Sequence, residues 1–528
     1  MNITLFKPVL SGLLLVAALS IACSTASAFE KGSLVQKKCI VCHSAENGKL
    51  ARVEDVRTTP EEWTVIVDRM RRLHGMKIKA GEMAILLKEL CATQILSPEE
   101  AAQVSYINLF NNPQTIETPD GADEERLFAT CVRCHSFAKI YSYRMTESAW
   151  AKLRDFMIYI DPAIMFQMRE MHWRTEADRV LQELAQKLPY KQAWTAPEAK
   201  PDGEWLALGV EPGKGSYRGK ATLKSEGNDE YALQGVLNFS DGTVESFSGE
   251  GTLYGGYALR TRTSHNGSST MGAFSFVDGI ISGEHHHNGP DFRTSSSTWY
   301  PITKNSQALR ATPAFLLGGE ETKILIEGIK LPEVSVKDIS VSDAELEVLQ
   351  ATTSSPETIE VLLVYRGSGH GSASVSVKGL ASGSHSLALQ LAPRIDYLSL
   401  SPATGRARVN GGVNYPAEGV QFQALAWSRG ADSDKPSDDI LLGPVDAEFS
   451  LAEEISRPGD DDLVYMGAIE ANGTYLPIGD YQPIPAREYG GEGTGMVKVI
   501  AKYTRGEVPY TAEGRLVVTV PDYIQRLK

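Results

Sequence analysis

Two short stretches of the chain place a pair of cysteines directly before a histidine. The pattern C-x-x-C-H occurs once near position 40 and again about ninety residues later. Its residues are Cys39, Cys42 and His43 in the first copy, and Cys131, Cys134 and His135 in the second. This spacing is the attachment signature of c-type haem.

The spacing has a chemical reason. Two thiols three positions apart can each form a thioether with a vinyl group of one haem, and the next histidine can bind the iron as an axial ligand. A zinc site or a redox-active dithiol also uses C-x-x-C. Zinc would need further Cys or His ligands at each site, and a thioredoxin-like dithiol needs neither the histidine nor a second copy. The sequence therefore predicts two covalently bound haems c, with His43 and His135 as proximal ligands.

The two motifs belong to a longer internal repeat. The pattern Arg-x-Thr-x-x-x-Trp, followed by a methionine, spans Arg57–Met70 and recurs with an offset of 87 as Arg144–Met157. In the first copy Thr59, Pro60 and Glu62 predict a helix start with a capping box. The helices that close the two units align with an offset of 94, so the second unit contains seven extra residues.

The alignment of the closing helices also suggests the distal iron ligands. It matches His74 with Met168, and we predict these two residues as the sixth ligands of the first and second haem. Met76 is the next candidate for the first haem, and Met171 and His172 for the second. A thioether ligand raises the haem potential relative to imidazole, so two different ligands would give electrons a direction.

The N-terminus has the features of an export signal. Lys7 precedes the apolar run Val9–Ala22, and small residues end at Ala28, where cleavage would leave a mature chain in the periplasm. The run is shorter than the roughly 20 residues of a spanning helix, so no membrane span is expected. Cys23 offers a lipoprotein site as a weaker alternative. A fifth mature cysteine, Cys91, lies on an apolar helical face and is expected to be an inert buried thiol.

Composition limits the fold and the partners. At 528 residues the chain is too long for one core. Its net charge of -14, without a basic block, argues against a nucleic-acid partner, because phosphate contacts require concentrated positive charge.

The second part of the sequence changes to a β pattern after the Pro-rich stretch Thr195–Trp205. We expect a multidomain protein: an all-α tandem diheme cytochrome c domain followed by three antiparallel β domains. The expected bounds are 1–28 for the signal peptide, 29–195 for the cytochrome domain, 196–303 for a β-barrel, 304–390 for an Ig-like β-sandwich and 391–528 for a C-terminal Ig-like β-sandwich.

Histidines in the β part raise the question of a metal-binding site. They form the run His285–His287 and the stretch Ser264–Gly267. Because no carboxylate or cysteine nearby completes a recognisable ligand set, we expect surface or interface histidines, and no catalytic residue in the β part.

This combination resembles the alpha subunit of quinohemoprotein amine dehydrogenase. The resemblance rests on the two C-x-x-C-H motifs, on "TPEEW" at Thr59–Trp63, and on "WLALGVEPGKGSYRGKA" at Trp205–Ala221. It implies a periplasmic heterotrimer with a β-propeller subunit and a small subunit that carries cysteine tryptophylquinone. It further implies oxidation of primary amines to aldehyde and ammonia, and electron transfer through this chain to an external cytochrome c or cupredoxin.

Two other functions stay open from the residues alone. One is a stand-alone periplasmic diheme cytochrome c whose β domains bind another molecule. The other is a diheme peroxidase, which would need one haem with an open sixth position.

Overall fold

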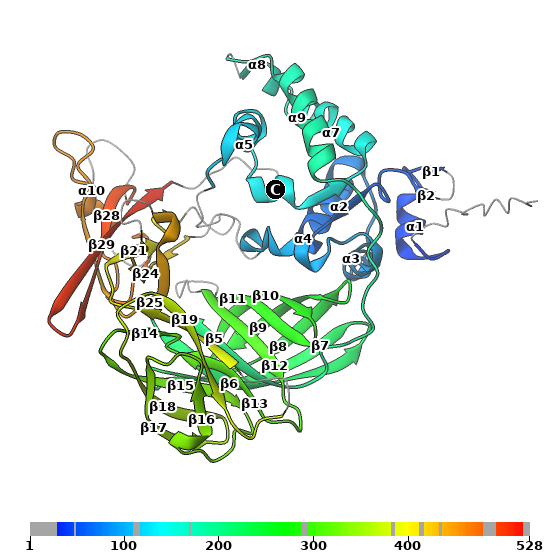
Figure 1. Cartoon of the computed structure of the whole chain (residues 1–528). Helices are drawn as coiled ribbons and strands as arrows, with labels where there is room; N and C mark the ends of the chain where they lie inside the picture. The colour runs from blue at the N-terminus through cyan, green and yellow to red at the C-terminus, as the bar shows by residue number, and fades with distance from the viewer. Residues whose placement is uncertain are drawn as a thin grey trace, which may run out of the picture.

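The computed structural model describes residues 29–46, 49–108, 117–167, 170–287, 294–381, 386–410, 417–431, 436–478 and 493–520. Helices come first in the chain and strands follow (Figure 1). The predicted signal peptide and Met168 lie outside the described residues. Among the described residues, no helix is both long and apolar enough to cross a membrane.

The N-terminal domain is mainly helical. Its helices are α1 (Leu34–Cys39), α2 (Pro60–His74), α3 (Glu82–Thr93), α4 (Pro98–Ala102), α5 (Gly121–Leu127), α6 (Phe137–Tyr141), α7 (Glu147–Ile160), α8 (Ile164–Gln167) and α9 (Trp173–Lys187). It also contains the 3-10 turn η1 (Ser105–Ile107), the π-helical turn η2 (Phe128–Val132) and the short strands β1 (Ala45–Glu46), β2 (Lys49–Leu50), β3 (Val56–Thr58) and β4 (Tyr143–Met145). The all-α expectation therefore omits two small strand pairs.

The repeat predicted from the sequence is present in the structure. Strands β3 and β4 occupy equivalent places in the two units and pair with each other antiparallel, with Arg57 opposite Arg144. The indole of Trp63 donates to Gln94 O at 2.7 Å, and the indole of Trp150 donates to Leu188 O at 3.2 Å. These matching bonds confirm the offsets of 87 and 94. The two units are thus related by an approximate twofold axis through the β3–β4 pair.

A closed eight-stranded barrel follows the helices. Its strands pair in chain order and β12 closes on β5. They are β5 (Gly203–Glu211), β6 (Gly215–Gly227), β7 (Glu230–Phe239), β8 (Val244–Tyr254), β9 (Ala258–His265), β10 (Ser268–Val277), β11 (Ile280–His287) and β12 (Thr294–Pro301). Side chains alternate between the inside and the outside, and aromatic and aliphatic residues fill the interior.

The expectation of surface or interface histidines is wrong for His265, His285 and His287, whose rings are buried and lie against one another inside the barrel. His286 is buried as well. Alternate residues of a strand point to the same side, so the run places two of its three histidines inward.

Two β-sandwiches complete the chain. The first pairs β13 (Gln307–Thr312), β15 (Glu321–Ile329), β18 (Thr358–Tyr365) and β17 (Leu346–Ser355) in one sheet, and β14 (Phe315–Leu317), β20 (Ser386–Ala392), β19 (Gly371–Val377) and β16 (Ile339–Val341) in the other. The second contains β21 (Tyr397–Ser401), β24 (Gln423–Ser428) and β25 (Ile440–Val445) in one sheet. Its other sheet contains β22 (Thr404–Arg408), β29 (Val508–Thr519), β28 (Gly495–Arg505) and β26 (Glu448–Glu453). Smaller elements are β23 (Val420–Gln421), β27 (Thr474–Tyr475), α10 (Asp462–Met466), η3 (Val336–Asp338) and η4 (Pro436–Asp438).

The first helical unit is docked on the barrel at the β8–β9 turn. Tyr257 of this turn donates its hydroxyl to Leu96 O at 2.8 Å, and Trp194 donates to Gly255 O at 2.6 Å. Gly255 has φ +56°, and an added Cβ would lie 2.7 Å from the Ile95 side chain, so only glycine fits this close approach. The barrel therefore holds the helical domain through a tight, specific contact.

Candidate functional site

The first C-x-x-C-H motif lies where helix α1 ends. Ser33 caps the start of α1, and its last residue is Cys39. The amides of Cys42 and His43 both donate to Cys39 O, at 3.1 and 2.8 Å, so one tight turn brings the two thiols and the imidazole together. Cys39 is half-buried and Cys42 is exposed.

The ring of His43 is oriented by the backbone. Its Nδ1 atom lies 3.1 Å from Ala51 O, which accepts a hydrogen bond when Nδ1 carries the proton. Burial lowers the pKa of His43, so the imidazole is neutral near pH 7. This arrangement leaves Nε2 as the atom that can bind a metal.

The second motif repeats this turn at the end of η2, which includes Cys131. The amides of Cys134 and His135 donate to Cys131 O, at 3.2 and 3.3 Å. The π-helical turn is fixed from the side by the indole of Trp173, which donates to Thr130 O at 3.0 Å. The structure thus places each predicted motif residue on a compact turn at a helix end.

The thiols do not resemble a redox-active pair. Burial, the charge of Glu89 and the neighbouring Cys42 raise the pKa of Cys39 to about 11, and burial with Cys134 raises the pKa of Cys131 to about 12. Reactive dithiols need a lowered pKa, because the thiolate is the nucleophile. Cys91 is fully buried among apolar side chains, as expected, and burial raises its pKa as well.

The predicted distal ligand of the first unit is on the last turn of α2. His74 is exposed, stacks on Tyr159 with ring centroids 6.3 Å apart, and is close enough to lower the pKa of His43. The alternative residue, Met76, packs its side chain on the core of the first unit. Of these two residues, His74 is the more accessible to a ligand site next to His43.

In the second unit, the predicted ligand Met168 lies outside the described residues. The alternatives beside it have other contacts: Met171 packs on the small core around Ile164 and Trp173, and His172 Nδ1 lies 2.8 Å from Thr175 Oγ1.

One local expectation is wrong in its detail. Thr59 caps α2 and accepts a hydrogen bond from the Glu62 amide at 3.3 Å, but the Glu62 side chain does not return to the Thr59 backbone. It pairs instead with Lys139 and accepts a hydrogen bond from the Tyr143 hydroxyl, both in the second unit. The Glu62 carboxylate is buried and needs a countercharge, which Lys139 supplies and a local cap bond does not.

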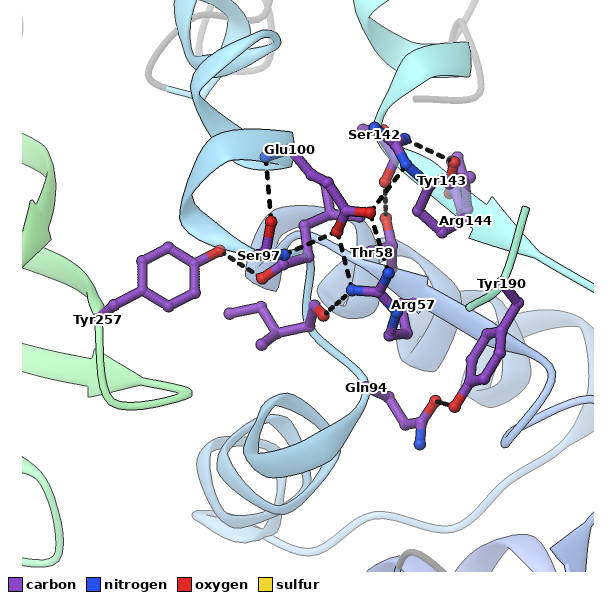
Figure 2. A network of polar contacts seen from close by, with 12 residues as sticks. Arg57, Thr58, Gln94, Ser97, Glu100, Ser142, Tyr143, Arg144, Tyr190 and Tyr257 are labelled. Carbon is purple, nitrogen blue, oxygen red and sulfur yellow. Dashed lines mark hydrogen bonds and ion pairs between the residues drawn. The ribbon is translucent and has the colours of Figure 1, made fainter. Parts of the chain in front are cut away.

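A partly buried carboxylate lies at the centre of the two units (Figure 2). Glu100 receives two hydrogen bonds from the Arg57 guanidinium, at 2.8 and 3.0 Å, and lies 3.2 Å from Arg144 Nε. Burial raises the pKa of Glu100, but the hydrogen bonds from Arg57 and the Ser97 amide outweigh this effect and leave it below its usual range. Both arginines are almost fully buried. One carboxylate therefore holds two repeat-related cations at the approximate twofold axis.

Sequence reasoning identified the two arginines only as repeat markers and missed Glu100. The signal was present in "SPEE", where Ser97 and Glu100 form a reciprocal capping box at the start of α4. The cap fixes the carboxylate in position, but nothing in the local sequence shows which arginines it meets.

Comparison with known families decides what this geometry belongs to. Residues 30–194 match the haem-binding domain of the quinohemoprotein amine dehydrogenase alpha subunit. Residues 198–294 match domain II and residues 398–527 match domain IV of the same subunit. The chain belongs to the family of quinohemoprotein amine dehydrogenase alpha subunits. The resemblance seen in the sequence and the expected fold class are confirmed, and the chain is a subunit of an oxidoreductase complex that contains a haem-binding domain.

Other comparisons add little to the family assignment. No curated protein matches the chain. Among solved structures, a redesigned β-barrel, mFAP1, bound to DFHBI, is 12% identical, covers 19% of this chain and 93% of that chain, and has a TM-score of 0.18. SGBP-B of Bacteroides ovatus is 10% identical, covers 48% of this chain and 53% of that chain, and has a TM-score of 0.17. InvD of Yersinia pseudotuberculosis is 8% identical, covers 59% of this chain and 97% of that chain, and has a TM-score of 0.15. At these TM-scores, none of the three bears on function.

Replacing Glu100 by glutamine should destabilise the helical domain. Glu100→Gln leaves two buried guanidinium groups without their carboxylate, which costs about 3–5 kcal/mol of unfolding free energy. Because the fold lowers the pKa of Glu100, its contribution is present near neutral pH and is lost as the pH falls through the folded pKa. Chemical denaturation of both proteins, followed by tryptophan fluorescence, measures the difference.

The matched control is Asp68→Asn, which removes the exposed ion pairs of Asp68 with Arg71 and Arg72 on α2. It should cost less than about 1 kcal/mol. Equal effects of the two substitutions would contradict the role given to Glu100.

Proposed function

We propose that this chain is the diheme electron-transfer subunit of a periplasmic quinohemoprotein amine dehydrogenase. The observation that carries the proposal is the duplicated C-x-x-C-H turn, because two equivalent attachment sites are held in one domain by a direct β3–β4 pairing. In this function each unit holds one covalent haem c, through Cys39 and Cys42 or through Cys131 and Cys134.

The residues present fit a haem at each motif. The two thiols of a motif lie on one turn, and His43 is held by Ala51 O with Nε2 left for an iron. Apolar side chains beside the motifs are exposed, including Ile40 and Val41 within the first motif and Phe128 before the second. Large exposed apolar groups favour an apolar cover such as a macrocycle. A haem held at each site would supply reversible one-electron exchange.

The side chains around the motifs give each unit its own environment. His74 would serve as the distal ligand of the first haem and Met168 of the second. An imidazole and a thioether favour different oxidation states of the same iron, so the two units would differ in potential. The polar groups at the β3–β4 pair keep the relative placement of the two units fixed, which a relay requires.

Partners complete the reaction in this proposal. Membership of the alpha-subunit family implies other subunits, which we propose are a β-propeller and a small subunit with cysteine tryptophylquinone. The amine would be oxidised to aldehyde and ammonia at that quinone. This chain would accept the electrons and pass them to an external cytochrome c or cupredoxin.

Removing one cysteine pair should remove one haem. The double variant Cys39→Ala, Cys42→Ala loses both thioether positions of the first unit, so the purified chain should contain half the haem of the unaltered chain. Pyridine haemochrome absorbance per chain and intact-mass spectrometry measure this content. Cys91→Ala is the matched control and should keep both haems, because Cys91 lies in an apolar core away from either motif. Equal haem content in the double variant and in the unaltered chain would contradict the attachment sites.

Removing the proposed distal imidazole should open one coordination position. His74→Ala should convert the first haem from low spin to high spin and let the ferrous protein bind carbon monoxide, whereas Met76→Ala should change neither property. Electron paramagnetic resonance and the carbon monoxide difference spectrum report the change. A low-spin His74→Ala protein together with a high-spin Met76→Ala protein would assign the ligand to Met76 instead. The same comparison of Met168→Ala with Met171→Ala tests the second unit.

The natural complex should reduce its haems when a simple primary amine is added. Purification from the periplasm without dissociating conditions should yield two further subunits with this chain, and the absorbance of reduced haem c should rise on addition of methylamine or butylamine. The isolated chain is the control and should stay oxidised, because it has no quinone of its own in this proposal. A chain that purifies alone, and whose haems stay oxidised after amine is added, would instead favour a stand-alone diheme cytochrome.

A further inference from the structure

Three histidines meet inside the barrel, in a place unrelated to the haem motifs. His265 ends strand β9, and His285 and His287 lie on β11, with β10 between these two strands. One ring nitrogen of each lies within 4.8 Å of the corresponding nitrogens of the others. All three side chains are buried, with exposed fractions of 6%, 6% and 1%.

Two carboxylates approach this cluster from other strands. Glu245 Oε2 of β8 lies 3.6 Å from His265 Nδ1, and Glu211 Oε2 of β5 lies 3.7 Å from His287 Nε2. Both glutamates are buried. Burial raises the pKa of Glu245, but its contact with His265 and its ion pair with Lys214 outweigh this effect and lower it to about 2. Lys214 already pairs with Glu245, so these two carboxylates and this lysine together leave one net negative charge beside the histidines, which favours a cation.

One ring nitrogen of the cluster lacks a hydrogen-bond partner. His285 Nε2 is buried and has no hydrogen-bond partner among the described residues. Leaving such a group unsatisfied costs about 1–3 kcal/mol. Burial and the neighbouring His265 and His287 lower the pKa of His285 well below its usual range. A neutral imidazole has a lone pair on one ring nitrogen, and one ring nitrogen of His285 lies within 4.8 Å of nitrogens of the other two rings, as metal binding requires.

There is space beside the rings for one small additional ligand. A cavity of about 10 Å³ is lined by His265, His285, Tyr217, Phe247 and Trp299, among others. This volume is close to the minimum that holds a water molecule.

We propose that His265, His285 and His287 bind one divalent transition-metal ion of the zinc class. Imidazole nitrogens suit zinc, copper, nickel and iron, and three histidines with an open fourth position form a recognised zinc geometry. With metal–nitrogen distances of about 2.0–2.1 Å, the nitrogens would be about 3.3 Å apart. Small side-chain rotations from the present separations would reach this distance. The ion would link β9 to β11 across one end of the barrel.

The competing explanation needs no metal. A proton on one imidazole, together with the Lys214 ammonium that pairs with Glu245, could balance Glu211 and Glu245, and the cluster would then be a buried hydrogen-bond and charge network. The two explanations differ in whether zinc binds at this place. The proposal does not depend on the haems or on the reaction partners.

The test uses the full mature chain with its haems, purified without a histidine tag and stripped with a chelator. Zinc is then supplied alone, and binding is measured by competition with a chromophoric chelator and by elemental analysis after dialysis. The unaltered chain should bind one zinc ion at the cluster. His285→Asn should bind it at least about 100-fold more weakly, because even loss of an outer-shell partner weakens metal sites by about 10–100-fold.

His286→Asn is the matched control. His286 precedes His287 on the same strand and faces the other side, where its Nδ1 lies 3.3 Å from Thr294 Oγ1. It should bind zinc like the unaltered chain. Circular dichroism and the haem spectrum check that each variant is folded.

A crystal of the unaltered chain soaked in zinc keeps the proposal falsifiable if His285→Asn does not fold. An anomalous peak between the three rings at the zinc edge would support the site. No peak there, or equal zinc affinity in folded His285→Asn and His286→Asn, would overturn it and leave the charge network.

Discussion

The contact of Glu100 with Arg57 and Arg144 is the constraint on which the helical domain depends. Two guanidinium groups at equivalent places of a repeat would repel each other in a buried strand pair, and a single carboxylate from α4 offsets that repulsion. The Glu100 carboxylate also accepts a hydrogen bond from the Ser97 amide, so it fixes the loop before α4 as well. The orientation of one repeat unit relative to the other follows from this arrangement.

Neighbouring contacts extend the constraint to the barrel. Arg57 also donates to Ile95 O at 3.1 Å, and the next carbonyl, of Leu96, accepts the Tyr257 hydroxyl from the β8–β9 turn. The Arg260 guanidinium of β9 pairs with Glu61 on α2 at 2.5 Å. Gln94 of the same segment accepts a hydrogen bond from the Tyr190 hydroxyl, which follows α9, so the segment between α3 and α4 contacts both repeat units and the barrel. Motion of one haem motif relative to the other would require breaking several buried polar contacts at once, which is the rigidity that a relay between two redox sites needs.

Local patterns predicted the parts of the structure that local chemistry determines. The C-x-x-C-H spacing, the Thr59 cap and the repeat offsets depend on neighbouring residues, and the equivalent bonds of Trp63 and Trp150 agree with the two offsets. Contacts between distant segments could not be predicted in this way. The sequence suggested a capping role for Glu62, whereas the fold gives it Lys139, 77 positions away. The barrel similarly brings His265 next to His285 and His287, although neither segment alone contained a ligand set.

The central claim is that this chain holds two electron-transfer sites that differ in potential. A spectroelectrochemical titration of the purified full chain, followed at the absorbance of reduced haem c, tests it most directly. The account predicts two one-electron transitions of equal amplitude at separate potentials. A single transition at one potential, whether it accounts for one haem per chain or for two, would contradict it.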